Sequence, residues 1–290
     1  MALLILALLL TLLQSQAQKP STPAQSETPL AQSVDTAWSV LHDGYTDKSA
    51  DRRAHATRAL GLLKHEAKAQ AMAEKALADD TSANVRVQAA VALGDMDAMS
   101  AQPNLLEALK DNDLKVVVAA ANSLYKFKNP AAYDIYYALL TGERKGPGLV
   151  KSQLDTLRDK KQLEELALET GIGFIPFGGM GLEAYKRITS DDNELVIELA
   201  TEKLATDPDP KTGQALENAC ASGKWAIRLA AVEALAKRGD GSLGYSVVPL
   251  MYDSKEEVRY AAAATVIRLS RAPLKKPAVH KVPRTGTHQR

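Results

Sequence analysis

The sequence predicts an all-α protein, an α-solenoid of stacked helix-turn-helix repeats with one interrupting insertion. The first observation behind this prediction is composition, because the 290 residues include 47 alanines and 39 leucines but only 3 phenylalanines and 2 tryptophans. Alanine and leucine are strong helix formers, whereas strands favour β-branched and aromatic residues, so an all-β fold is excluded. The second observation is an internal repeat of about 31 residues through the middle of the chain.

The N-terminal segment, residues 1–17, is expected to be a signal peptide. An apolar run at residues 2–13 is followed by Ser15-Gln16-Ala17, with small residues at the two positions that a signal peptidase recognises. Twelve apolar residues rise about 18 Å as a helix, less than the roughly 30 Å core of a bilayer. We therefore predict cleavage after Ala17 and export to the periplasm or the extracellular space. No lysine or arginine precedes the run, so an uncleaved membrane anchor stays open as the alternative.

Residues 18–34 contain three prolines among polar residues and are expected to be a flexible linker. The repeats follow it, at 35–144 and 194–270. Each repeat is marked by an apolar anchor near the end of one helix, and the anchors are Leu60, Leu93, Leu124, Leu204, Leu235 and Val266. Their spacings are 33, 31, 80, 31 and 31 residues, so the period is interrupted once.

A second amphipathic stretch follows the anchor and begins near a proline at Pro103 and Pro130, where a missing N–H costs little. One such pair of helices cannot bury both of its faces, and stacking against neighbours completes the core. A lone helix near residues 36–41 and another at 258–270 are expected to be half repeats that cap the two ends.

An acidic residue that closes one helix, then Val-Arg, two alanines and Leu-Gly form a pattern that resembles HEAT repeats, in particular the short, phycobilisome-lyase type of an exported bacterial protein. In that family an aspartate and an arginine often bond between neighbouring repeats. Asp79 or Asp80 before Arg86, and Asp253 before Arg259, match this pair. The resemblance therefore implies an inter-repeat structural role for Asp80, Arg86, Arg228, Asp253 and Arg259. It covers residues 34–270 apart from the interruption and implies an architecture rather than a function, because the family includes scaffolds, transport receptors and occasional enzymes.

The interruption, residues 145–193, holds a predicted long helix and then an uncharged, glycine-rich run at 171–181. This run is not a dinucleotide fingerprint, because a helix precedes it and Pro176 occupies the place of the last glycine. Two interpretations stay open. In one, the apolar loop folds back to plug the stack. In the other, a docking site for a partner or a membrane surface is formed by Ile172, Phe174, Ile175 and Phe177.

The sequence carries no recognisable catalytic, metal or cofactor site. The five histidines lack the spacing of zinc ligands, and no serine sits in a nucleophile elbow. Cys220 is the single cysteine, which excludes an intrachain disulfide. A buried structural thiol is the expected state of Cys220, while an intermolecular disulfide stays open.

These observations favour a non-catalytic protein–protein interaction scaffold or binding module of the cell envelope or periplasm, with an unidentified protein partner and with the inner helices as contact surface. The alternative, by analogy with the phycobilisome-lyase type, is a lyase-like or chaperone-like protein that acts on a chromophore-bearing or modified protein. A purely structural envelope protein is a third interpretation. The disordered tail at 271–290 carries six lysines or arginines and no acid. Nucleic acid is not expected as a partner, membrane contact stays open through the N-terminal segment or the apolar loop, and the oligomeric state is not fixed.

Overall fold

The computed structural model describes residues 29–141 and 194–274, and the structural statements below concern these two ranges. Every regular element in them is a helix, which confirms the prediction of an all-α solenoid. The first range contains α2 (Pro29–Gln32), α3 (Val34–Tyr45), α4 (Ala50–Leu60), α5 (Ala67–Asp79), α6 (Ala83–Asp95), η1 (Met99–Ala101), α7 (Gln102–Ala108), α8 (Leu114–Lys126) and α9 (Ala131–Thr141). The second contains α13 (Glu194–Leu204), α14 (Pro210–Ala219), α15 (Trp225–Arg238), η2 (Gly241–Ser246), η3 (Val248–Tyr252) and α16 (Glu256–Ser270).

Local sequence explains where several of these helices begin and end. The side chains of Ser49 and Asp113 accept backbone N–H bonds in the first turns of α4 and α8, which satisfies donors that have no partner inside the helix. Pro210 opens α14, where its missing N–H is not needed. α15 ends at Gly239, whose φ of +62° lies in the left-handed region that glycine adopts without strain.

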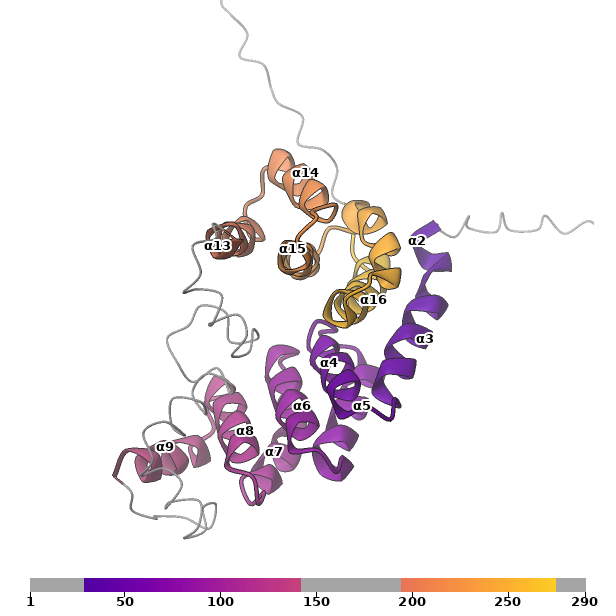
Figure 1. Ribbon diagram of the computed structural model, residues 1–290. Helices are drawn as coiled ribbons and strands as arrows, with labels where there is room; N and C mark the ends of the chain where they lie inside the picture. Colours follow the sequence, from indigo (N-terminus) through magenta and orange to yellow (C-terminus); the bar gives the residue numbers. More distant parts are fainter. Residues whose placement is uncertain (1–28, 142–193, 275–290) are drawn as a thin grey trace, which may run out of the picture.

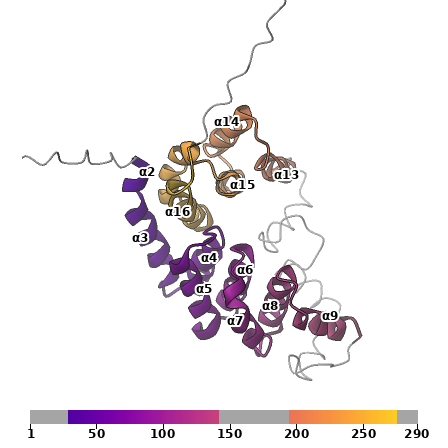
Figure 2. The ribbon, with the colours of Figure 1, turned by 180° about the vertical axis from the view of Figure 1, so that it is seen from behind.

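The stack does not follow the order of the chain. Within the described ranges, six helices form an inner row, and their order in space is α13, α15, α16, α4, α6 and α8 (Figure 1). α14, η3, α3, α5 and α7 pack along the outside of this row. The view from behind shows the same arrangement, with α16 against both α3 and α4 (Figure 2). The C-terminal repeats therefore precede the N-terminal repeats in the stack, and we call the contact of α16 with α3 and α4 the joint.

The expectation that the first and last helices cap opposite ends is wrong, because α3 and α16 lie against each other in the middle of the stack. The physical reason is the sequence of α16, in which residues 260–267 are at most 5% exposed. A helical stretch without a polar face needs cover on all sides, and α3 and α4 add to the contacts that α15 and η3 make with α16. Gly44 of α3 permits the close approach, since a Cβ there would lie 2.5 Å from the ring of Tyr260.

Folded structure extends into both segments that the sequence predicts to be flexible. α2 begins at Pro29, inside the predicted linker 18–34, because Leu30 is an apolar side chain that becomes 3% exposed when it packs beside Gly244. At the other end, the tail predicted to begin at Arg271 still contacts the fold, where the N–H of Gly241 donates to the carbonyl oxygen of Pro273 at 3.2 Å. The signal peptide at 1–17 and the insertion at 145–193 lie outside the described residues and stay predictions.

Candidate functional site

Three arginine–aspartate pairs tie neighbouring repeats together along one edge of the inner row. They are Arg53–Asp80, Arg86–Asp111 and Arg228–Asp253. In each pair, Nε and Nη2 of the arginine donate to the two carboxylate oxygens at 2.7 to 3.0 Å. This two-pronged geometry is the strongest that the two side chains can form. We call each such pair a rung.

Backbone groups near each rung hold its two side chains in position. In Arg86, for example, Nη1 donates at 2.9 Å to the carbonyl oxygen of Asp80, six residues earlier, which fixes the guanidinium at the start of α6. The carboxylate of Asp111 accepts the N–H of Asp113 at 2.8 Å, which fixes the acceptor in the loop before α8. Both partners are therefore held in place before they meet, so little side-chain entropy is lost when the rung forms.

The structure places the five predicted inter-repeat residues in a pattern shifted by one repeat. Arg228 and Asp253 meet each other directly. Asp80 instead pairs with Arg53, and the side chain of Arg86 reaches forward to Asp111. Sequence reasoning missed Arg53 and Asp111 as members of rungs, although each rung joins an arginine to an aspartate 25 or 27 residues later.

Arg259, the fifth predicted residue, forms no rung within the described ranges. Its Nη1 donates to the carbonyl oxygen of Asp253 at 2.7 Å and to that of Ser254 at 3.2 Å. Its Nη2 lies 3.8 Å from Glu256 of the same helix, which is too long for a hydrogen bond.

The rungs change the acidity of their aspartates. The hydrogen bond from Arg53 is the largest cause that lowers the pKa of Asp80 below its ordinary value. For Asp253, burial raises the pKa, but the hydrogen bonds from Arg228 and from the N–H of Lys255 outweigh burial, so the pKa is again lowered. These carboxylates are ionised at neutral pH, and the rungs are intact charge pairs there.

A second polar cluster, which we call the charged face, gathers side chains from the inner row. Asp95 of α6 accepts from Arg58 of α4 and from Lys126 of α8, both at 2.7 Å. Burial raises the pKa of Asp95, but attraction to these two cations outweighs it, so the pKa is lowered. On α13 and α15, Glu202 lies 3.8 Å from Lys237. Helices that are distant in sequence thus contribute to one surface.

Glu233 of α15 completes the charged face, and within the described ranges it has no ion pair. It retains contact with solvent, but several helices crowd it, and the resulting desolvation is the largest cause that raises the pKa of its carboxyl. Arg58 lowers this pKa, while repulsion from Asp95 and Glu202 raises it. The charged face therefore contains one acid whose charge its neighbours do not fully balance.

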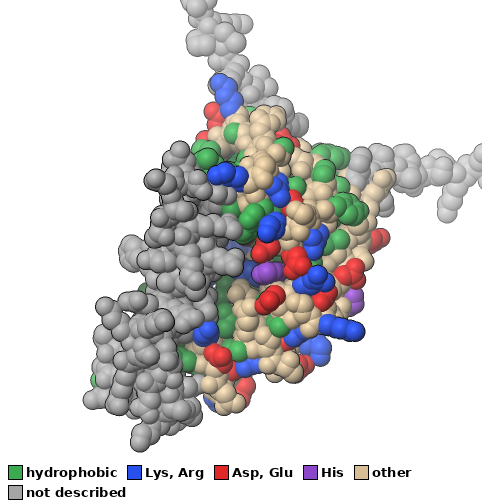
Figure 3. Space-filling view, viewed as in Figure 1, with side chains coloured by type: hydrophobic (Ala, Val, Ile, Leu, Met, Phe, Trp, Pro, Cys, Tyr) green, Lys and Arg blue, Asp and Glu red, His purple; other side chains and the backbone are tan. Residues whose placement is uncertain are grey.

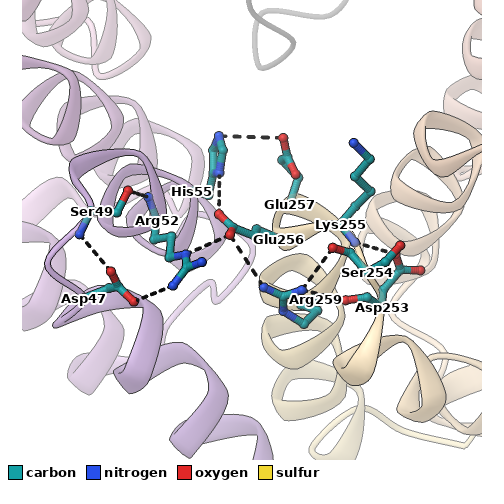
Figure 4. Close-up of polar contacts among 10 residues, drawn as sticks. All are labelled: Asp47, Ser49, Arg52, His55, Asp253, Ser254, Lys255, Glu256, Glu257 and Arg259. Atoms are coloured by element: carbon teal, nitrogen blue, oxygen red, sulfur yellow. Dashed lines mark hydrogen bonds and ion pairs between the residues drawn. The ribbon is translucent and has the colours of Figure 1, made fainter.

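At the joint, a network of ion pairs connects the two parts of the stack (Figure 4). Arg52 of α4 donates to Glu256 of α16 at 2.8 Å and to Asp47 at 3.1 Å. His55 lies between Glu256 and Glu257, at 3.8 Å from each. Figure 3 shows that charged side chains of both signs and a histidine gather in the middle of this side of the molecule.

The described ranges hold few groups suited to covalent or metal chemistry. No cluster of three histidine, cysteine or acidic residues that could bind a metal ion occurs in them. Cys220 is 4% exposed, and burial, followed by the charge of Glu217, raises the pKa of its thiol to about 12. The thiol is protonated and shielded at neutral pH, which disfavours the intermolecular disulfide that the sequence left open.

The predicted docking residues Ile172, Phe174, Ile175 and Phe177 lie outside the described residues, so the choice between plug and docking site stays open. None of the helices in 29–141 and 194–274 combines the length and the apolar character that a bilayer span requires.

A family model matches part of the chain. Residues 73–146 match the model of a family described as HEAT repeats, and the matched segment includes α6, α8 and the rung between Arg86 and Asp111. This match supports a HEAT-repeat protein, and HEAT repeats generally mediate protein–protein interaction. A search of curated proteins finds no match.

Proposed function

We propose that this chain is a non-catalytic scaffold that binds a protein partner on the charged face. The observation that carries the proposal is the convergence of Arg58, Asp95, Lys126, Glu202 and Glu233 from five different helices of the inner row. A repeat stack is well suited to this role, because a partner that lies along it contacts several repeats at once.

The charge pattern indicates how the partner is recognised. Asp95 already has two cationic partners, so it holds the surface together rather than offering a free charge. Glu233 has no ion pair in the described ranges, and its pKa is raised by desolvation and by repulsion from Asp95 and Glu202, although Arg58 lowers it. A cation of the partner would stabilise its ionised form. Complementary charges at such a surface increase the rate of encounter and the choice of partner more than the affinity itself.

We further propose that the scaffold acts in the cell envelope or periplasm, as a short, phycobilisome-lyase-type HEAT-like protein of an exported bacterial kind. The support is the apolar run at residues 2–13 with small residues after it. N-terminal sequencing of the mature protein, combined with cell fractionation, tests this location. A mature N-terminus at Gln18 supports export with cleavage, and an intact Met1 in the cytoplasmic fraction contradicts it.

The lyase-like or chaperone-like function is the second candidate, and one observation favours it. His55, Glu256 and Glu257 bring a histidine and two carboxylates together on the exposed side of the joint. A substrate that depends on these groups should be affected by His55→Ala. Binding of a partner to the charged face should instead change when Glu233 is replaced and stay unchanged when His55 is replaced.

The decisive experiment uses the full chain as bait, with chemical cross-linking and peptide mapping of the captured partner. Glu233→Lys reverses the charge of the unbalanced acid and should reduce capture at least tenfold. Glu107→Lys makes the same change on α7, where the Glu107 side chain is 73% exposed and faces away from the inner row, and should leave capture unchanged. Equal capture by both variants, or cross-links confined to the outer helices, would contradict the proposal.

A further inference from the structure

The joint contains the two halves of a fourth rung that do not meet. In the three formed rungs, the aspartate carboxylate accepts a backbone N–H two residues later. At Asp80 and Asp253, an arginine six residues later also donates to the carbonyl oxygen of that same aspartate. Asp47 has both features. Its Oδ1 accepts the N–H of Ser49 at 2.8 Å, and its carbonyl oxygen accepts Nη1 of Arg53 at 3.0 Å. Asp47 is therefore built as a rung acceptor.

Arg259 is built as the matching donor. Its Nη1 binds the carbonyl oxygen of Asp253, six residues earlier, as Arg86 binds that of Asp80. In a formed rung, Nε and Nη2 would then hold the aspartate of the next repeat in the stack. The repeat after α16 in the stack is that of α4, and its acceptor is Asp47.

Other residues occupy both positions in the structure. Oδ2 of Asp47, the atom that receives Nε in the formed rungs, is bound by Nη1 of Arg52 (Figure 4). The nearest carboxylate to Arg259 Nη2 is Glu256, at 3.8 Å. The unmade rung is also more open to solvent, since the side chains of Asp47 and Arg259 are each 27% exposed, against 6 to 13% for the aspartates of the formed rungs.

We propose that the joint is a two-state device in which Asp47 exchanges between Arg52 and Arg259. In the state described here Arg52 holds Asp47 and Glu256 together, and Arg259 is left without a rung. In the second state Arg259 takes Asp47, while Arg52 keeps Glu256, and the stack becomes continuous through a fourth rung. In the exchange, Asp47 loses a single exposed contact with Arg52 and gains a two-pronged contact with Arg259. The two states therefore differ little in the number of charges that are paired.

The device also provides a way to regulate the charged face, and this consequence rests on the proposed function. The side chain of Arg52 is 49% exposed and belongs to the same polar network as His55 and Glu257 (Figure 4). A partner carboxylate that binds Arg52 would release Asp47 to Arg259, so partner binding and closure of the fourth rung would favour each other.

The test measures coupling between pairs of side chains in the full chain, without any partner, so its result is independent of the proposed function. Urea unfolding is measured for Arg259→Gln, Asp47→Asn and the double variant, first with Arg52 present and then in the Arg52→Gln protein. With Arg52 present, the two substitutions should be additive within twofold in the unfolding equilibrium constant. In the Arg52→Gln protein the two substitutions should couple by tenfold or more in the unfolding equilibrium constant. Arg228→Gln and Asp253→Asn, which break a formed rung, should show the same coupling in the unaltered protein.

Two results would overturn the device. Coupling between Arg259 and Asp47 that is already tenfold with Arg52 present would show that the joint is an ordinary rung. Coupling of Arg259 to Glu256→Gln, with none to Asp47→Asn in the Arg52→Gln protein, would show that Arg259 has no access to Asp47. Arg52 lies on an exposed surface, so its replacement by glutamine is expected to leave the protein folded.

Discussion

The rung between Arg228 and Asp253 allows a quantitative test of what holds the repeats together. Its side chains are the most buried of the three rungs, with Arg228 14% and Asp253 6% exposed. In the unaltered protein the N–H of Lys255 donates to Oδ1 of Asp253 at 2.9 Å. Asp253→Asn keeps the size of the side chain and an oxygen that can accept this N–H. It removes the charge that Nε and Nη2 of Arg228 contact at 2.7 and 2.8 Å.

The expected loss follows from the two hydrogen bonds and the burial. A hydrogen bond to a charged group contributes about 1.5 to 3 kcal/mol, and removal of one partner from a fully buried charge pair costs about 3 to 5 kcal/mol. The guanidinium of Arg228 keeps its hydrogen bond to the carbonyl oxygen of Ser222 and partial contact with solvent. We therefore expect Asp253→Asn to lower the free energy of unfolding by about 2 to 3 kcal/mol. For a fold of this size that corresponds to a decrease in Tm of about 5 to 10 °C.

The effect should depend on pH in a defined direction. The pKa of Asp253 is lowered in the folded protein from an ordinary value of 3.8, so its contribution is complete above that value and is lost as the pH falls through the folded pKa. The difference in unfolding free energy between the unaltered protein and Asp253→Asn should therefore be constant from pH 7 to about 5 and vanish in stronger acid. Urea unfolding at a series of pH values measures it.

The matched control is Asp79→Asn, which removes the same charge from an exposed pair. Asp79 and Lys75 of α5 are 63% and 70% exposed, and solvent screens such exposed i,i+4 pairs so that they contribute little to stability. A Tm decrease of about 1 °C is expected. If Asp253→Asn costs no more than Asp79→Asn, or if its cost persists in strong acid, the rungs are not what stabilises the contact between repeats.

Three further predictions test packing, thiol chemistry and the charged face. Gly94→Ala should lower stability by about 1 to 3 kcal/mol, because the new Cβ would lie 2.3 Å from Oγ of Ser123, whereas Gly223→Ala, with nothing within 4 Å, should be close to neutral in the same urea titration. Cys220 should react with a thiol reagent at neutral pH only after unfolding, and labelling of the folded protein at the rate of a free thiol would contradict its burial. Glu233→Gln should raise the Tm slightly at pH 7 and not in acid. The raised pKa of Glu233 means that its ionised form destabilises the fold, and this cost is absent where the carboxyl is protonated. An unchanged or lower Tm at pH 7 would refute this.

The helices of the stack were predictable because their signal is local and repeated. The anchors Leu60, Leu93, Leu124, Leu235 and Val266 are all completely buried, as an apolar position that recurs every 31 to 33 residues should be, whereas the anchor Leu204 is 37% exposed. A period in sequence identifies the same place in each repeat, and burial of that place follows from stacking.

The partners within the rungs were harder to predict, because Arg53 and Arg86 each have one aspartate six residues earlier and another 25 or 27 residues later. Asp80 precedes Arg86 by six residues, and this closeness suggests a pair. The backbone carbonyl of Asp80 does contact Arg86, but its carboxylate is directed back to Arg53 of the preceding repeat. A one-dimensional pattern does not state whether a side chain points to the repeat before it or after it.

The members of the charged face have a regular spacing, but that spacing alone does not show that they meet. Arg58, Glu202 and Glu233 lie two residues before the anchors of their helices, and Asp95 and Lys126 lie two residues after theirs. A surface of this kind is defined by which helices are neighbours in space. The repeat period predicts neighbours only for helices that follow each other in sequence.

One feature of the sequence indicates the order of the helices in the stack, and this order explains where the charged face lies. Residues 260–267 of α16 contain no charged side chain over two turns, which is unusual for a terminal helix and indicates cover from a further element. That element is supplied by α3 and α4, so the joint between the two chain ends lies in the middle of the inner row. The charged face spans the joint, with Arg58 and Asp95 on one side and Glu233 on the other. A partner bound there contacts both parts of the stack, and by linkage any partner that requires both parts must also stabilise the joint between them.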